Sequence, residues 1–346
     1  LVLENNRKAS QLKNVEKTDG KERGSSIWVN IDFIEMKKFI GLLLLMGIVH
    51  KPCYLDYWSK DTLLSTLSCH EPQPLFENEP PHTAAERDRL YEIRPSLTHF
   101  NTVFQQAFCP NRDICIDESL LLWKGRLVFK QYIPLKRAKF GIKIFCLCDK
   151  FGYLYRFRVY TGKQDPLYNI DNYVSEECQQ LSMTSKVTLE LLAPFLNQGY
   201  HLYIDNWYNS VPLIRFLLQK QILCTGTTHS NRVPKELTSI PAKKGETVSI
   251  ISGQLLAEKF LDKKTVYMIS FFSAETAKKM HRVSVQHYNQ GMGGVDRLDQ
   301  ALEPISAARQ TRQWYVKLGV HLIQLAILNA HHLNKQFGNQ KTFLQF

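Results

Sequence analysis

Three aspartates, Asp117, Asp205 and Asp296, lie in sequence contexts that favour a chemical role for their carboxylates. Asp117 lies in ICIDESLLLWKGR and Asp205 in YHLYIDNWYNS, both apolar, aromatic runs typical of strands, in which aspartate is depleted. Asp296 follows a glycine pair in MGGVDRLDQ and opens an expected helix, where Asp299 would share its face. Carboxylates from separate segments suit a site for two Mg²⁺ or Mn²⁺ ions, because hard cations take oxygen ligands. Such a site would catalyse phosphoryl transfer by in-line displacement, without a protein nucleophile.

Each carboxylate also has an ordinary explanation. Asp117 would end a strand in solvent, and Asp205 would belong to a plain turn. Asp296 and Asp299 would complement the positive end of a helix dipole. Taken singly, the ordinary explanation is favoured. The catalytic interpretation therefore depends on the order of the elements and on the charge of the chain.

Charge and composition narrow the class of protein. The 346 residues carry a formal charge of +12, which favours a polyanionic partner such as nucleic acid, the alternative being a merely basic enzyme. The longest apolar run, residues 39–49, is too short to span a bilayer and reads as a buried helix, so no membrane partner is expected. Eight cysteines include no CxxC pair, so we expect reduced thiols packed in a core, in the cytosol or the nucleus.

The chain divides into five expected regions. They are a disordered basic N-terminus (1–28), a helical region (29–112) interrupted by a proline-rich loop (67–86), the first part of a core (113–228), a β-rich insertion (229–285) and the completion of the core (286–346). Asp32 is the expected N-cap of a helix over 31–49, and Pro95 is expected to break a helix over 86–108.

From residue 113 the pattern becomes strand-like. Expected strands cover 114–123, 140–148, 153–160, 200–204 and 222–227, with helices over 185–196, 211–220, 294–302 and 311–333. Three strands, helix, strand, helix, strand is the order of an RNase H-like core, a mixed α/β fold. The first and fourth strands of such a sheet are neighbours. Asp117 and Asp205 would therefore converge, and Asp296 would close the site from a later helix.

The same residues resemble a known family. The resemblance runs from WVNIDFIEMKKFIGLLLLMGIVHKPCYLDYWS through DRLYEIRP, DESLLLWKGR, YIPLKRAKFGIKIFCLCD, YIDNWYNS and KKGE to YNQGMGGVDRLDQ and the WYVKL helix. Over nearly its whole length the chain resembles piggyBac-type DNA transposases. The most specific signals are D-N-W-Y-x-S and YNxxMGGVDxxDQ.

The resemblance implies a fold, an activity and a set of ligands. The fold would be an RNase H-like catalytic core with a β-rich insertion and an N-terminal helical region for dimerisation and DNA binding. The activity would be excision by nicking and hairpin formation, followed by joining of 3′-hydroxyls to TTAA targets in double-stranded DNA. Asp117, Asp205 and Asp296 would be the catalytic metal ligands, Asp299 a further acidic ligand, and Mg²⁺ or Mn²⁺ the cofactor. A homodimer and a nuclear location follow from the same resemblance.

Cations near these motifs would contact DNA phosphates, the alternative being a solvated basic face. Trp207 and Tyr208 could stack on unpaired bases, although we expect one of the two to be a core residue. The expected DNA-binding residues are Lys124, Arg126, Lys136, Arg137, Lys139, Lys143 and Trp207.

The chain departs from the family pattern in several places. A family helix is replaced by Cys69–Leu75, a basic segment is shortened at Lys278–Gln286, and the cysteine-rich C-terminal module is missing. The chain begins at Leu1 rather than methionine, so we expect a fragment or a partial gene product. Two hypotheses follow: a metal-dependent transposase, or a domesticated or decaying descendant that binds DNA without moving it. A third, an RNase H-like nuclease of another kind, is disfavoured by YNxxMGGVDxxDQ.

Overall fold

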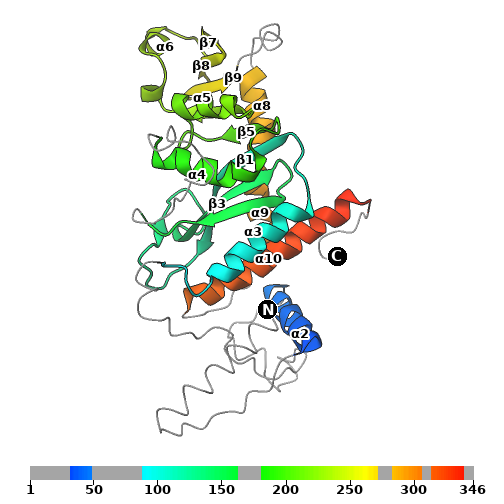
Figure 1. Cartoon of the computed structure of the whole chain (residues 1–346). Coiled ribbons are helices and arrows are strands. Elements are labelled where there is room, and N and C mark those ends of the chain that lie inside the picture. The colour runs from blue at the N-terminus through cyan, green and yellow to red at the C-terminus, as the bar shows by residue number, and fades with distance from the viewer. Residues whose placement is uncertain (1–31, 49–87, 163–180, 272–282, 306–312, 339–346) are drawn as a thin grey trace. The chain divides into compact units, whose positions relative to one another are not determined.

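The computed structural model describes residues 32–48, 88–162, 181–271, 283–305 and 313–338 (Figure 1). The expected N-terminal segment 1–28, the proline-rich loop 67–86 with Cys69–Leu75, and most of the shortened basic segment lie outside the described residues. The chain forms two compact units, Leu1–Leu97 with Leu302–Ile327, and Thr98–Ala301 with Leu328–Phe346.

The first unit contains helix α2 (Phe33–Ile48). Asp32 caps its start, as expected, and forms a reciprocal capping box with Glu35. Asp32 Oδ1 accepts a hydrogen bond of 2.7 Å from the Glu35 amide, and Glu35 Oε2 accepts one of 3.1 Å from the Asp32 amide. In the described part of the chain, no helix combines the length and apolar character needed to cross a membrane.

The second unit is built on one mixed sheet of nine strands. The strands are β1 (Asp113–Leu122), β2 (Gln131–Tyr132), β3 (Phe140–Asp149), β4 (Leu154–Val159), β5 (His201–Ile204), β6 (Leu223–Thr228), β7 (Thr247–Ser252), β8 (Leu255–Leu261) and β9 (Thr265–Phe271). Strand β1 is antiparallel to β3 and parallel to β5, and β5 is parallel to β6. The neighbour order β4-β3-β1-β5-β6 confirms the RNase H-like core.

The expected strands of the insertion continue this same sheet. Strand β9 pairs antiparallel with β6, β8 with β9, and β7 with β8. The insertion therefore adds three strands to the core sheet beside β6. Without them, β6 would be an edge strand with unpaired backbone groups.

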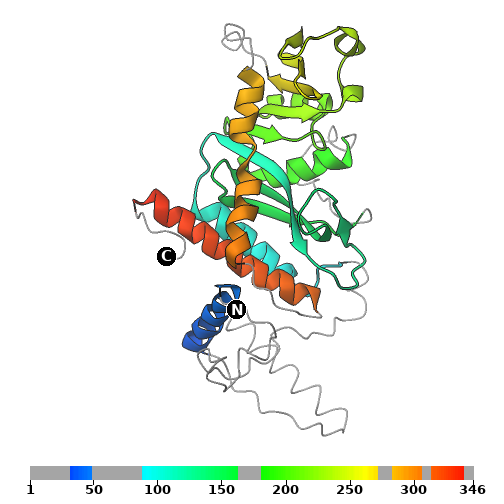
Figure 2. The ribbon, with the colours of Figure 1, turned by 180° about the vertical axis from the view of Figure 1, so that it is seen from behind.

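The remaining helices that the structure describes are α3 (Arg94–Ala107), α4 (Met183–Leu192) with the 3₁₀ turn η4 (Ala193–Phe195), α5 (Val211–Gln219), η5 (Ser230–Arg232), α6 (Lys235–Ser239), α8 (Val283–Gly291), α9 (Gly294–Leu302), η6 (Glu303–Ile305) and α10 (Trp314–Gln336). Of these, η6 and most of α10 belong to the first unit. Helices of the second unit cover both faces of its sheet. Helices α4 and α5 lie on one face (Figure 1), and α8 and α9 cross the other (Figure 2).

Pro95 begins a helix instead of breaking one. Helix α3 starts at Arg94, so the expected helix over 86–108 is shorter at its N-terminal end. Proline is tolerated in the first helical turn because the amide it lacks would have no partner there.

Two asparagine side chains form hydrogen bonds with backbone groups along the outer edge of β4. The Asn101 side chain accepts a hydrogen bond of 2.9 Å from the Phe157 amide and donates one of 3.0 Å to its carbonyl. Asn329 makes the same pair of bonds with Leu154, at 2.9 and 2.8 Å. Each side-chain amide thus supplies the donor and acceptor that a further strand would supply.

Candidate active site

The alternation of β1 divides its side chains between the two helical layers. Ile114 and Ile116 belong to the apolar core that also contains residues of α4 and α5. Cys115 lies against Gly294 at the start of α9. Since successive strand residues point to opposite faces, Asp117 shares the α9 side with Cys115, and Glu118 shares the other side with Ile116.

Asp205 lies beside Asp117 because their strands are parallel neighbours. Ile116 of β1 is in register with Ile204 of β5, and an aspartate follows each isoleucine. Asp205 Oδ1 accepts a hydrogen bond of 2.8 Å from the Trp207 amide, which fixes the carboxylate at the end of its strand. The two acidic groups that the sequence places 88 residues apart are therefore adjacent in the sheet.

Two glycines let the helix pair α8–α9 approach the sheet closely. A Cβ on Gly294 would lie 2.1 Å from the Asp149 carbonyl oxygen and 2.6 Å from Cys115 Sγ. A Cβ on Gly291 would lie 2.4 Å from the Tyr203 ring. Only glycine fits either position. The glycines of the motif before Asp296 therefore have a packing role that brings the first turn of α9 over β1.

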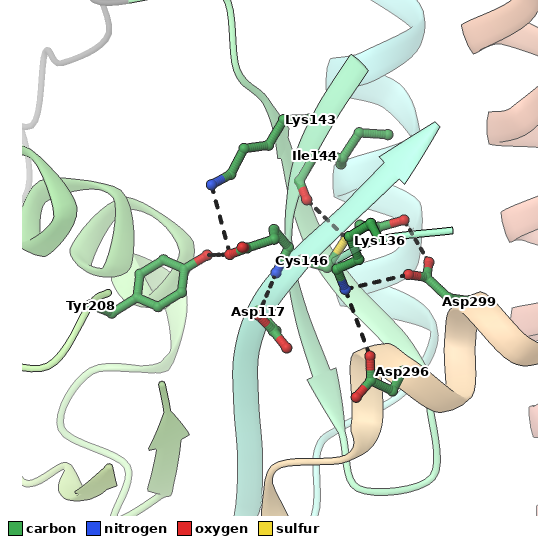
Figure 3. A network of polar contacts seen from close by, with 10 residues as sticks. Asp117, Lys136, Lys143, Ile144, Cys146, Tyr208, Asp296 and Asp299 are labelled. Carbon is green, nitrogen blue, oxygen red and sulfur yellow. Dashed lines mark hydrogen bonds and ion pairs between the residues drawn. The ribbon is translucent and has the colours of Figure 1, made fainter. Parts of the chain in front are cut away.

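Lys136 forms ion pairs with the acidic residues of α9. Its Nζ lies 3.7 Å from Asp296 Oδ1 and 3.9 Å from Asp299 Oδ2. Figure 3 shows this ammonium beside both α9 carboxylates, with Asp117 of β1 close by. The charges of Asp117, Asp299 and Asp296 together raise the pKa of Lys136 against the opposing effect of its burial. Lys136 is therefore the counter-ion of this acidic group.

Ser119 holds one of these carboxylates in place. Its hydroxyl donates a hydrogen bond of 2.5 Å to Asp299 Oδ1. Ser119 is buried and lies two residues after Asp117, on the same side of β1. The bond therefore ties the middle of α9 to the strand that carries the first aspartate.

Burial and mutual repulsion disfavour the ionised forms of the acids. Desolvation, followed by the charge of Glu118, raises the pKa of Asp117 from 3.8 to about 7. Desolvation is also the main reason that the pKa values of Asp205 and Asp299 are raised. Carboxylates in this condition are stabilised by a nearby cation, which a metal ion or an ammonium can provide.

The donor chemistry of the site fits a hard divalent cation. Asp117, Asp205, Asp296 and Asp299 offer only carboxylate oxygens, which Mg²⁺ and Mn²⁺ prefer. Among the described residues, no three histidine, cysteine, aspartate or glutamate side chains are grouped closely enough to hold one metal ion. The cation present between the α9 carboxylates is the Lys136 ammonium.

The opposite side of β1 carries a second polar cluster. Lys143 Nζ lies 3.7 Å from Glu118 Oε2, which also accepts a hydrogen bond of 3.2 Å from the Tyr208 hydroxyl. The same ammonium lies 4.4 Å from the centroid of the Trp207 ring and 4.8 Å from that of Phe145. We name Glu118, Lys143, Phe145, Trp207 and Tyr208 the aromatic cluster.

The expected DNA-binding residues fall into different environments. Lys124, Arg126, Arg137 and Lys139 are exposed on the segment between β1 and β3. Lys136, in the same segment, is bound to the acidic residues. Lys143 and Trp207 belong to the aromatic cluster, with Lys143 only 9 % exposed and Trp207 stacked on Phe145. Tyr208 is fully buried, which confirms that one of the two aromatic residues after Asp205 is a core residue.

Sequence reasoning missed two side chains that position the site. Ser119 could have been found from its i+2 spacing to Asp117, which places both on one strand face. Arg232 donates hydrogen bonds of 2.8 and 2.7 Å to the carbonyl oxygens of Asn206 and Asn209, and so clamps the loop that follows Asp205. No local pattern marks Arg232, since it lies on a short turn remote in sequence from that loop.

Comparison with known proteins identifies the family of the chain. The family model described as transposase IS4, which includes piggyBac-type enzymes, matches residues 1–331. The chain is similar to two human proteins. It is 27% identical to piggyBac transposable element-derived protein 3 over 90% of this chain and 57% of the relative. It is 23% identical to piggyBac transposable element-derived protein 2 over 87% of this chain and 55% of that relative. The chain thus spans little more than half the length of these curated relatives.

A solved structure shares the fold. The piggyBac transposase in its synaptic complex with hairpin DNA, determined by cryo-electron microscopy, superposes with a TM-score of 0.78. The match covers 99% of this chain and 74% of the other, at 24% sequence identity. At this identity the match establishes the mixed α/β architecture.

Proposed function

Because the chain belongs to the piggyBac-type transposase family, we propose that it performs metal-dependent phosphoryl transfer on double-stranded DNA. The observation that carries the proposal is the ion pairing of Lys136 with Asp296 and Asp299, together with the charge of Asp117, which raises the pKa of the same lysine and lies in the strand next to Asp205. Two strands of the sheet and one helix, distant in sequence, bring carboxylates within electrostatic reach of one another. Ordinary strand ends and helix dipoles would not require this convergence.

The residues would act as follows. Asp117 and Asp205 would hold Mg²⁺ or Mn²⁺ from the sheet, with Asp296 and Asp299 completing the ligand set from α9. When bound, the metal would activate the attacking water or 3′-hydroxyl and stabilise the leaving oxygen. Ser119 would keep the Asp299 carboxylate in position. The exposed cations Lys124, Arg126, Arg137 and Lys139 would position the DNA by contacting its phosphates, without reading its sequence.

The family resemblance supplies the finer terms of the proposal. The DNA would be a transposon end with a TTAA target, the location nuclear, and the working assembly a homodimer. The relative in the solved structure is a synaptic complex with hairpin DNA, which supports DNA as the partner here.

A second candidate is a transposase-derived protein that binds DNA without cutting it. The specific observation in its favour is the ion pairing of Lys136 with Asp296 and Asp299, since an ammonium already offsets part of their negative charge. Under this hypothesis the carboxylates would have no catalytic role, and the exposed cations would still bind phosphates.

The test is Mg²⁺-dependent or Mn²⁺-dependent nicking of a DNA end flanked by TTAA. Wild type should nick the DNA, and Asp205→Ala should lose at least about 10³-fold in rate, because removal of a metal ligand removes transition-state stabilisation. Asp262→Ala is the matched control, since Asp262 is an exposed aspartate in the turn between β8 and β9. It should retain the wild-type rate.

The same assay separates the two candidates. Salt-sensitive DNA binding with no nicking by wild type would reject catalysis and favour the second candidate. Equal nicking by wild type and Asp205→Ala would show that the observed cleavage does not come from this site.

A further inference from the structure

Lys136 occupies a position that the backbone fixes tightly. It lies in the connection between β2 and β3, where β2 pairs with β3 through Gln131 and Tyr132. Within this connection the Ile133 amide donates a hydrogen bond of 2.8 Å to the Lys139 carbonyl. The Lys136 amide donates one of 3.2 Å to the Ile133 carbonyl. A turn closed in this way holds its backbone in one conformation, so the Lys136 side chain emerges at a fixed point above the acidic residues.

The ammonium itself is held loosely. Its two carboxylate partners lie at 3.7 and 3.9 Å, beyond the length of a good charge-assisted hydrogen bond. The Lys136 side chain is 23 % exposed, and that of Asp296 is 65 % exposed. Ion pairs of this kind contribute little net free energy because water competes for both partners. The lysine stem is flexible, so the ammonium can leave while the turn stays in place.

We propose that Lys136 is a tethered counter-ion, whose ammonium takes the place of a divalent cation beside Asp296 and Asp299 and is displaced when metal binds. The inference rests on the proposed function, because it concerns the same carboxylates. Its chemical basis is competition, since one positive group at this place excludes another by repulsion and by occupying the same oxygens. Without metal, the ammonium offsets the mutual repulsion of the acids.

Metal affinity tests the proposal directly. Mn²⁺ binding to the 346-residue chain would be measured by electron paramagnetic resonance, which detects the free ion, in the absence of DNA. Lys136→Met should bind Mn²⁺ about tenfold more tightly than wild type, because a competing charge has been removed. Lys139→Met carries the same change in net charge three residues away, where the side chain is exposed. It should change the affinity less than about twofold, because the charge is solvated.

Thermal unfolding provides a second measurement. Without metal, Lys136→Met should unfold at a lower temperature than wild type, because the acidic residues lose their counter-ion. Added Mn²⁺ should raise its unfolding temperature by more than it raises that of wild type. A lysine that only packed against its neighbours would give a loss that metal does not restore. Lys136→Gln provides the same comparison if the methionine variant fails to fold.

The outcomes distinguish this inference from the proposed function. Equal Mn²⁺ affinity of wild type and Lys136→Met, or weaker binding by the variant, would overturn the competition while leaving the metal site in place. Absence of Mn²⁺ binding in wild type and both Lys136 variants would overturn the competition and the metal-dependent function together.

Discussion

The two sides of β1 each pair a lysine with acidic residues, yet they hold these charges differently. Lys143 is buried in the aromatic cluster, on a central strand, with Glu118 and two aromatic rings around its ammonium. Lys136 lies on a turn and reaches the α9 carboxylates from partly exposed positions. The first arrangement is enclosed and suits a structural role. The second leaves its ion pairs partly exposed to water, which is what the proposed exchange of the ammonium for a metal ion requires.

The largest expected effect comes from removing the enclosed lysine. Lys143→Met would leave the Glu118 carboxylate without its cation in a poorly solvated place, and should lower the free energy of unfolding by about 3 kcal/mol. Urea unfolding followed by circular dichroism measures this loss. Lys136→Met should cost less than about 1 kcal/mol in the same assay, since its ion pairs are partly exposed.

If both lysine variants lost a similar free energy of unfolding, the two sides of β1 would hold their charges in equivalent ways, and the enclosed and the exposed lysine would not differ in role. The double variant Glu118→Gln with Lys143→Met is the further control. It should recover part of the Lys143→Met loss, because no buried charge remains unpaired.

The next effect tests how closely α9 must approach β1. Gly294→Ala places a methyl group where the Asp149 carbonyl oxygen and Cys115 Sγ leave no room, and should destabilise the protein by about 2 kcal/mol. The unfolding temperature should fall because of the steric clash. The affinity for Mn²⁺ should fall as well, because α9 carries Asp296 and Asp299. The control is Gly41→Ala, at a helical glycine with no atom near its missing Cβ, which should not destabilise. An unchanged Gly294→Ala protein would mean that α9 adjusts without cost.

The third effect has the opposite sign and depends on pH. The pKa of Asp117 is about 7 in the folded protein, against an ordinary 3.8, so the folded state binds this proton more tightly than the unfolded state. The group therefore reduces stability as pH rises from about 4 to about 7, and the cost is fully present above that range. Asp117→Asn should be more stable than wild type at pH 8 without metal, by about 2 kcal/mol after allowance for partial solvation.

Chemical unfolding at several pH values measures this difference. The advantage of Asp117→Asn should shrink towards zero near pH 4, where the aspartate is protonated in both states. An advantage that stays constant with pH would indicate a packing effect in place of a charge effect.

The smallest effect concerns a single hydroxyl of the aromatic cluster. Tyr208→Phe removes the donor to Glu118 while Lys143 remains, and should cost about 1 kcal/mol. Nicking activity should be retained, because Tyr208 lies on the side of β1 away from α9. A loss of nicking without a loss of stability would instead place the aromatic cluster in the catalytic machinery.

Much of this architecture could be predicted from the sequence. The apolar runs predicted β1, β3 and β5 nearly to the residue, and the order of the elements predicted that β1 and β5 are neighbours in the sheet. The glycine pair before Asp296 correctly marked the start of α9. These features follow from local periodicity and from chain connectivity, which one sequence contains.

The roles of the two lysines could not be predicted in the same way. Lys136 and Lys143 belong to one basic run, and nothing local distinguishes them. Strand β3 is buried along nine of its ten residues, so alternation does not reveal which side Lys143 occupies. The approach of Lys136 to Asp296 joins residues 160 positions apart, and it depends on a two-residue strand, β2, that has no detectable pattern.

The side-chain amides along β4 set the direction in which this sheet can grow. Asn101 and Asn329 occupy the hydrogen-bonding groups of Leu154 and Phe157, so the outer edge offers no free template there to a strand from another molecule. At the opposite end the sheet continues from β6 through β9 and β8 to β7. A further strand from another chain could therefore pair at the β7 edge and leave the acidic residues at the centre of the sheet undisturbed.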